Sequence, residues 1–139
     1  MAATHGDPGK PAAQRPNVVA IDDDPKLLEL LREGLTDDYE VHCATNAQDG
    51  LRLIEDKVPS VVLLDIEMPG MDGYAICETI RETAWVRHIP VIFLTGHSGD
   101  AFASNASKAG GDAFMTKPFT FPDLIATIEK LRNANTRPK

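Results

Sequence analysis

Short apolar runs alternate with amphipathic segments along most of this chain of 139 residues. The runs are rich in Val, Ile and Leu, which is typical of strands that are buried in a sheet. They predict strands over residues 17–21, 39–44, 60–65, 89–95 and 112–115. Helical spacing of apolar residues predicts helices over 25–36, 46–57, 72–83, 99–109 and 120–132. Asp24 and Asp72 stand where the first and third helices begin, and we expect them to be N-caps.

Five strands that alternate with five helices predict an α/β fold, in which helices cover both faces of a parallel sheet. The predicted domain spans residues 17–132. The segments 1–16 and 133–139 lack this pattern, and we expect both to be disordered tails. In sheets of this kind, ligands bind beyond the carboxyl ends of the strands.

Polar residues that can carry chemistry lie at the ends of four predicted strands. Asp22 and Asp23 follow the first strand, and Asp65 ends the third. Thr95 ends the fourth strand, and Lys117 follows the fifth. Because like charges repel, carboxylates gathered at one edge need a positive charge nearby. Hard divalent cations prefer oxygen ligands, so these three carboxylates predict a site for Mg²⁺ or Mn²⁺.

A carboxylate at such a site can act as a nucleophile. It attacks a phosphoryl group and forms an aspartyl-phosphate. The transfer depends on positioning and on neutralising the charge of the phosphoryl oxygens. With Asp65 as nucleophile, the cation and the Lys117 ammonium supply positive charge, and the Thr95 hydroxyl supplies a donor. An ionised Asp65 needs no general base.

Four motifs carry a resemblance to a known family. They are Ile-Asp-Asp-Asp-Pro at 21–25, Leu-Asp-Ile-Glu-Met-Pro-Gly-Met-Asp-Gly at 64–73, Phe-Leu-Thr-Gly at 93–96 and Gly-Gly-Asp-Ala-Phe-Met-Thr-Lys-Pro-Phe at 110–119. Through these motifs, residues 17–131 resemble the receiver domain of bacterial two-component response regulators, with the chemotaxis regulators among them. The resemblance implies a doubly wound, flavodoxin-like fold with five parallel strands in the order 2-1-3-4-5.

The resemblance also implies roles for the acidic residues. It makes Asp65 the phospho-acceptor, Asp23 a direct metal ligand and Asp22 a ligand that acts partly through water. It adds the backbone carbonyl of Glu67 as a further metal ligand. Glu67 and His97 are implied to tune how fast the aspartyl-phosphate hydrolyses.

A second group of implied roles concerns switching. Lys117 is implied to pair with Asp65 or with the phosphoryl oxygens, and the Lys117–Pro118 bond is implied to be cis. Thr95 is implied to move toward the phosphoryl group, and Phe114 occupies the aromatic switch position. Their movement would remodel the surface of residues 99–132, where partners dock.

Two residues depart from the usual family pattern. Phe114 stands where many relatives carry Tyr, so a switch at this position would depend on packing alone. Gly96 follows Thr95 where Ala is usual, which gives that loop more freedom. Gly70 and Gly73 are interpreted as turn glycines.

The composition limits the classes of partner and the cellular compartment that fit this chain. A formal net charge of −7 disfavours direct nucleic-acid binding, because both surfaces would be negative. No apolar run reaches membrane-spanning length, and residues 1–16 lack the apolar core of a signal peptide. Cys43 and Cys77 form no CxxC pair and are interpreted as reduced thiols. We therefore expect a cytoplasmic protein that binds neither nucleic acid nor membrane.

The predicted function is that of a response-regulator receiver in phosphorelay signal transduction. A sensor histidine kinase or a histidine phosphotransfer protein would phosphorylate Asp65 in the presence of Mg²⁺. The modification would then switch contacts with a downstream target protein, and a homodimer is left open. Whether the chain counts as an enzyme is a matter of definition, because it would catalyse its own phosphorylation and dephosphorylation without a free substrate.

Other functions fit the sequence less well. A phosphatase of the haloacid-dehalogenase type would use Asp22-x-Asp24, but Lys26 stands where Thr or Val is expected. A dinucleotide-binding module needs a glycine-rich turn after the first strand, where this chain is acidic. The remaining alternative is a phosphorylation-independent adaptor with the same fold. The acidic set, together with Thr95 and Lys117, argues against it.

Overall fold

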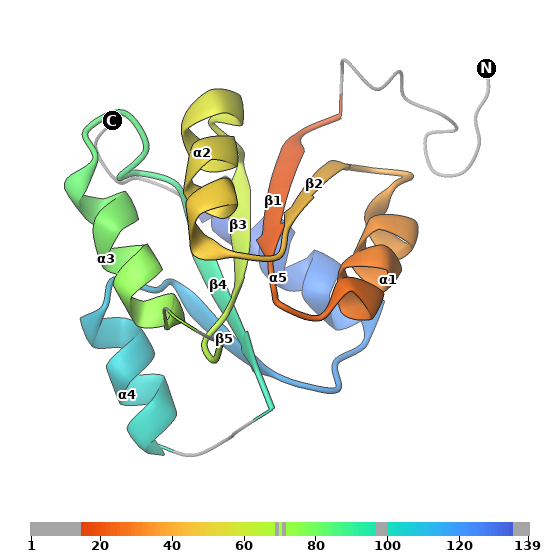
Figure 1. The fold of residues 1–139 in the computed structure, drawn as a ribbon. Coiled ribbons are helices and arrows are strands. Elements are labelled where there is room, and N and C mark those ends of the chain that lie inside the picture. Colours follow the sequence, from red (N-terminus) through yellow and green to blue (C-terminus); the bar gives the residue numbers. More distant parts are fainter. Residues whose placement is uncertain (1–14, 69, 71, 97–99, 135–139) are drawn as a thin grey trace.

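The computed structural model describes residues 15–68, 70, 72–96 and 100–134, and only the course of the backbone for residues 100–103. Within these ranges, five strands alternate with five helices, as the hydrophobic pattern predicts (Figure 1). The elements are β1 (Asn17–Ile21), α1 (Pro25–Leu35), β2 (Glu40–Ala44), α2 (Ala47–Lys57), β3 (Val61–Asp65), α3 (Gly73–Glu82), β4 (Val91–Thr95), α4 (Asp100–Lys108), β5 (Ala113–Thr116) and α5 (Phe121–Ala134).

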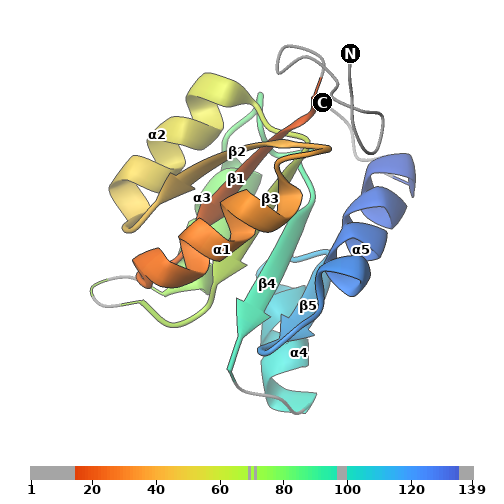
Figure 2. The same cartoon turned by 90° about the vertical axis from the view of Figure 1, so that its right-hand side faces the viewer.

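The strands form one parallel sheet in the order β2-β1-β3-β4-β5, which confirms the order that the resemblance implies. Helices α1 and α5 lie on one face of the sheet, and α2, α3 and α4 lie on the other (Figure 1, Figure 2). All five residues of β3 are buried, whereas the edge strand β5 is only half-buried over most of its length. Because every strand runs in the same direction, all their carboxyl ends meet at one edge of the sheet.

Two apolar clusters hold the helices against the sheet. The cluster under α2, α3 and α4 includes Val62 and Phe93, and the cluster under α1 and α5 includes Leu63, Ile92 and Leu124. Successive residues of β3 and β4 therefore point to opposite faces, as the two-residue period of a strand requires. The continuous apolar runs in the sequence reflect this burial on both sides.

The expected helix caps are confirmed. Asp24 Oδ1 accepts a hydrogen bond from the backbone N–H of Lys26 at 3.0 Å, and Asp72 Oδ1 accepts one from Ala75 at 2.8 Å. Each cap satisfies an N–H group that has no partner inside its helix. Helix α3 consequently begins at Gly73, one residue later than predicted.

Other element ends differ from the predicted ranges for local reasons. Strand β4 begins at Val91, two residues later than predicted. Pro90 has no N–H to donate, although its carbonyl accepts from Val62 at 2.9 Å. Helix α5 continues two residues past its predicted end, to Ala134. In the described part of the chain, no helix has both the length and the apolar character that a membrane span requires.

Candidate functional site

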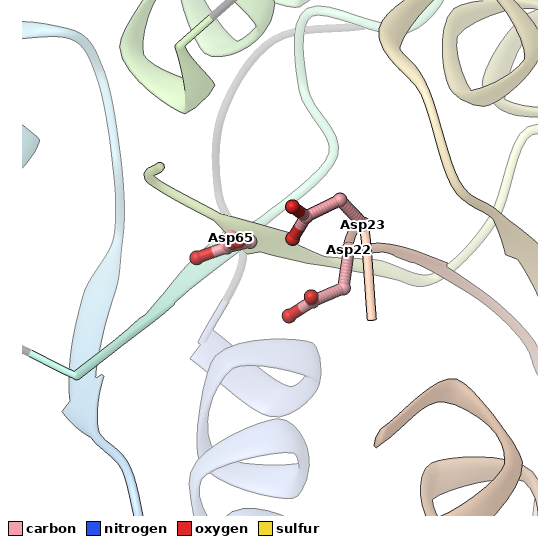
Figure 3. Close-up of side chains that lie close together, drawn as sticks. All are labelled: Asp22, Asp23 and Asp65. Atoms are coloured by element: carbon pink, nitrogen blue, oxygen red, sulfur yellow. The ribbon is translucent and has the colours of Figure 1, made fainter. Parts of the chain in front are cut away.

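Three carboxylates meet at the carboxyl edge of the sheet. Asp65 is the last residue of β3, and Asp22 and Asp23 directly follow β1, the neighbouring strand. Each offers one oxygen, and these oxygens all lie within 4.8 Å of one another (Figure 3). Asp22 is 2% exposed and Asp65 is 6% exposed, whereas Asp23 is open to solvent. The topology therefore brings together the three acidic residues that the sequence singles out.

Backbone and side-chain hydrogen bonds orient the two buried carboxylates. Asp22 Oδ1 accepts from the backbone N–H of Asp24 at 2.9 Å, and Asp65 Oδ1 accepts from that of Glu67 at 3.3 Å. The Lys117 ammonium donates to Asp22 Oδ2 at 2.9 Å and lies 3.6 Å from Asp65 Oδ1. One lysine thus faces both buried carboxylates.

The environment of Asp65 disfavours its charge. Burial and the nearby negative charge of Asp22 raise the pKa of Asp65 to about 6, although the Lys117 ammonium acts in the opposite direction. The crowding of negative charge at this edge is therefore only partly relieved by the lysine. An additional positive charge would stabilise the ionised form of Asp65.

Lys117 is held in its charged form. Burial disfavours the ammonium, but its hydrogen bond to Asp22 and the charges of Asp22 and Asp65 outweigh this effect and raise its pKa. The backbone N–H of Lys117 donates to Thr95 O at 2.6 Å, which joins the loop after β5 to the end of β4. The Lys117–Pro118 peptide bond is cis, as the resemblance implies.

The residues present fit a hard divalent cation. Three carboxylate groups face one another at a partly exposed position, and such oxygen donors suit Mg²⁺ or Mn²⁺. One ammonium cannot neutralise three carboxylates, so the cluster keeps a net negative charge. Asp22, Asp23 and Asp65 could therefore hold such an ion.

The remaining predicted site residues fall in different places. Thr95 is fully buried at the end of β4, where its partner in β5 is Thr116. Phe114 is half-buried and packs on the cluster under α2, α3 and α4. The side chain of Glu67 is exposed beside the acidic residues. His97 lies outside the described residues.

Two features of the site differ from the sequence interpretation or go beyond it. Gly73 is interpreted from the sequence as a turn glycine, but it is the buried first residue of α3 and contacts the backbone of Asp65. The turn interpretation suits Gly70 better, because its φ is +84°. A cavity of about 440 Å³ also adjoins Lys117 and is lined by Asp24, Lys26, Leu27, Leu30, Pro118, Phe119 and Phe121.

Comparison with known proteins agrees with this architecture. The family model of the response regulator receiver domain matches residues 18–129. A CheY-like receiver domain protein from Methanospirillum hungatei JF-1 is 27% identical, with a TM-score of 0.80 and coverage of 88% of this chain and 97% of that chain. The receiver domain of a signal transduction histidine kinase from Syntrophus aciditrophicus is 28% identical, with a TM-score of 0.78 and coverage of 89% and 95%. The BeF3-activated DrrB receiver domain is 30% identical, with a TM-score of 0.76 and coverage of 86% and 99%. This chain belongs to the response regulator receiver domain family.

Proposed function

We propose that this receiver domain accepts a phosphoryl group on Asp65 and that phosphorylation switches its contacts with a target protein. The observation that carries the proposal is the juxtaposition of Asp22, Asp23 and Asp65 with Lys117 at one sheet edge. Receiver domains interact with histidine kinases and downstream effectors. We therefore propose a sensor histidine kinase or a histidine phosphotransfer protein as the donor.

The proposed reaction is a direct transfer to the Asp65 carboxylate. One carboxylate oxygen forms a bond to phosphorus while the bond between phosphorus and the donor imidazole nitrogen breaks. The imidazole departs as the leaving group, and Asp65 becomes an acyl phosphate. With a pKa of about 6 before any cation binds, Asp65 is mostly ionised at neutral pH and needs no base to activate it.

The surrounding residues would stabilise the transferred group. Asp22, Asp23 and Asp65, with the backbone carbonyl of Glu67, would hold Mg²⁺, which supplies positive charge to the phosphoryl oxygens when bound. The Lys117 ammonium lies 3.6 Å from Asp65 Oδ1 and can donate to a phosphoryl oxygen without a large movement. Receiver domains generally bind Mg²⁺ through such an acidic pocket.

We propose that Thr95 and Phe114 transmit the change. The Thr95 hydroxyl stands at the carboxyl end of β4, and Phe114 lies on the neighbouring strand β5. A hydrogen bond from Thr95 to the phosphoryl group would draw the end of β4 toward Asp65, and the half-buried ring of Phe114 could repack in response. Moving such an equilibrium from 1:99 to 99:1 takes about 5.5 kcal/mol of differential stabilisation.

The lifetime of the acyl phosphate would depend on Glu67 and His97. Glu67 is exposed two residues after the acceptor, and His97 follows two residues after Thr95. We propose that both residues control the access of water to the acyl phosphate. Unchanged dephosphorylation rates after substitution of either residue would argue against this role.

A cytoplasmic location is part of the same proposal. Neither Cys43 nor Cys77 is part of a disulfide in the structure. Reduced thiols are typical of cytosolic proteins. Because Cys77 is buried, alkylation during denaturing lysis of the cells, followed by mass analysis, would test whether both thiols stay reduced.

The proposed chemistry can be tested by intact-mass measurement. Wild type and Asp65→Asn are incubated with a small phosphodonor, with and without Mg²⁺. We expect one phosphoryl adduct on the wild type with Mg²⁺, and none without Mg²⁺ or in the variant. A folded wild type that gains no adduct, even from a donor kinase, would instead favour a phosphorylation-independent adaptor.

A further inference from the structure

The start of α3 is packed directly against the backbone of the acceptor. Gly73 is buried, and its backbone N–H donates to Ile66 O at 2.7 Å. A Cβ atom added to Gly73 would lie 2.3 Å from the carbonyl oxygen of Asp65 and 2.9 Å from Cα of Ile66. Real Cβ contacts do not occur at such distances, and backbone atoms cannot swing aside as the end of a side chain can. Any larger residue at this position must therefore displace the acceptor backbone or the helix.

Glycine is required here for space and not for its conformational freedom. The backbone of Gly73 is helical, whereas Gly70 in the same loop adopts a φ of +84°, and a Cβ atom added to Gly70 would have no neighbour within 4 Å. A conformational requirement would act only on the local turn. A spatial requirement at Gly73 acts on Asp65 itself.

We infer that Gly73 is a positioning residue for the phosphoryl-transfer site, an inference that rests on the proposed function. Its contact fixes where the Asp65 backbone lies relative to Asp22, which follows the neighbouring strand β1. The same contact fixes the position of Ile66. Ile66 precedes Glu67, whose backbone N–H donates to Asp65. Gly73 thereby sets the geometry of the carboxylates and of the Glu67 carbonyl without touching the transferred group.

The first test compares two substitutions that each add one methyl group. Gly73→Ala presses on the acceptor backbone, whereas Gly34→Ala places its Cβ 2.4 Å from the ring of Phe121, on the opposite face of the sheet. Both are expected to lower the thermal midpoint. Only Gly73→Ala is expected to weaken Mg²⁺ affinity, measured by calorimetry without phosphodonor, by about 10- to 100-fold. Its phosphorylation rate constant at saturating Mg²⁺ is also expected to fall, by up to about 100-fold.

Mg²⁺ affinity and the phosphorylation rate constant at saturating Mg²⁺ together distinguish a positioning role of Gly73 from a loss of stability. A merely destabilised protein would keep the Mg²⁺ affinity of its folded fraction. Equal Mg²⁺ affinity and equal saturated rates in Gly73→Ala and Gly34→Ala would overturn the inference. If the wild type itself forms no adduct, the proposed function fails, whatever the variants do.

A second pair of variants decides the question if Gly73→Ala does not fold. Asp72→Ala removes the cap that fixes the start of α3, and Asp72→Asn retains a capping oxygen. The inference predicts weaker Mg²⁺ binding in Asp72→Ala, by a few-fold, and wild-type binding in Asp72→Asn. Wild-type affinity in both variants would contradict it.

Discussion

Lys117 lies closer to Asp22 than to the acceptor carboxylate. Its Nζ atom is 2.9 Å from Asp22 Oδ2 and 3.6 Å from Asp65 Oδ1. The other oxygen of Asp22 accepts from the backbone N–H of Asp24. Both oxygens of Asp22 therefore have partners within the protein. A cation that binds Asp22 therefore competes with the ammonium for the negative charge of that carboxylate.

This arrangement predicts competition between the lysine and Mg²⁺. Replacing Lys117 by Met removes a positive charge and releases Asp22 Oδ2. We expect the variant to bind Mg²⁺ more tightly, by about 1 kcal/mol or roughly fivefold, in a calorimetric titration. Phosphorylation should nevertheless become slower, because the ammonium no longer meets the phosphoryl oxygens. Lys26→Met serves as the control, because Lys26 and Lys117 both line the cavity of about 440 Å³. This variant should bind Mg²⁺ with the affinity of the wild type. Weaker Mg²⁺ binding by Lys117→Met would contradict the competition.

The pKa of Asp65 predicts how stability depends on pH in metal-free buffer. Its folded-state pKa of about 6 is above the ordinary value of 3.8 for an aspartate, so the folded state binds the proton more tightly than the unfolded state does. Ionisation of Asp65 therefore does not lower the free energy of unfolding below about pH 4. The loss grows as the pH rises from about 4 to 6 and is constant at higher pH. At pH 7.5, Asp65→Asn should therefore be more stable than the wild type, with a free energy of unfolding that is higher by about 1–3 kcal/mol. Urea unfolding at pH 4 and 7.5 tests this; a difference of the same size at both pH values would show that ionisation is not its source.

The backbone conformation of Val58 leads us to expect a stabilising substitution outside the site. It ends α2 with a φ of 43°, a left-handed conformation that is costly for a β-branched residue, and its side chain is 45% exposed. Val58→Gly should raise the free energy of unfolding by about 1 kcal/mol, because glycine adopts this conformation without strain. Val58→Thr keeps the branched Cβ and should show no gain. The substitution should leave phosphorylation unchanged, and a loss of stability in Val58→Gly would refute the argument from strain.

Substitution of Thr95 should separate phosphorylation of Asp65 from the conformational response at Phe114. Thr95→Ala keeps Asp65, Lys117 and the acidic residues, so it should still form the adduct. Without the hydroxyl, NMR shift changes at Phe114 on phosphorylation should become smaller, whereas Thr95→Ser should retain them. Shift changes of wild-type size at Phe114 in Thr95→Ala would remove Thr95 from the switch.

The sequence predicts the fold and the acidic cluster for the same physical reason. Asp22, Asp65 and Thr95 each stand at or just past the end of an apolar run, and in a parallel sheet all such ends lie at one edge. The hydrophobic pattern is therefore sufficient to place these residues at one edge of the sheet, whereas the order that makes β1 and β3 neighbours is implied only by the resemblance. The caps at Asp24 and Asp72 are also predictable, because the signal and its effect are a few residues apart.

The finer contacts of the site depend on distances that no pattern encodes. Lys117 and Asp22 are 95 positions apart, and the sequence could not show that this pair is shorter than the pair with Asp65. The requirement for glycine at position 73 arises from a backbone approach across a loop. A glycine near a turn gives the same sequence signal whether it is needed for conformation or for space.

The most direct test of the central claim is to locate the modified residue chemically. Wild type is phosphorylated with a small phosphodonor and Mg²⁺, treated with borohydride, which reduces an acyl phosphate on Asp to homoserine, and then mapped by peptide mass spectrometry. The account predicts homoserine at position 65 alone, and none when Mg²⁺ is withheld. Homoserine at Asp22 or Asp23, or an unmodified Asp65 in a folded protein, would contradict it.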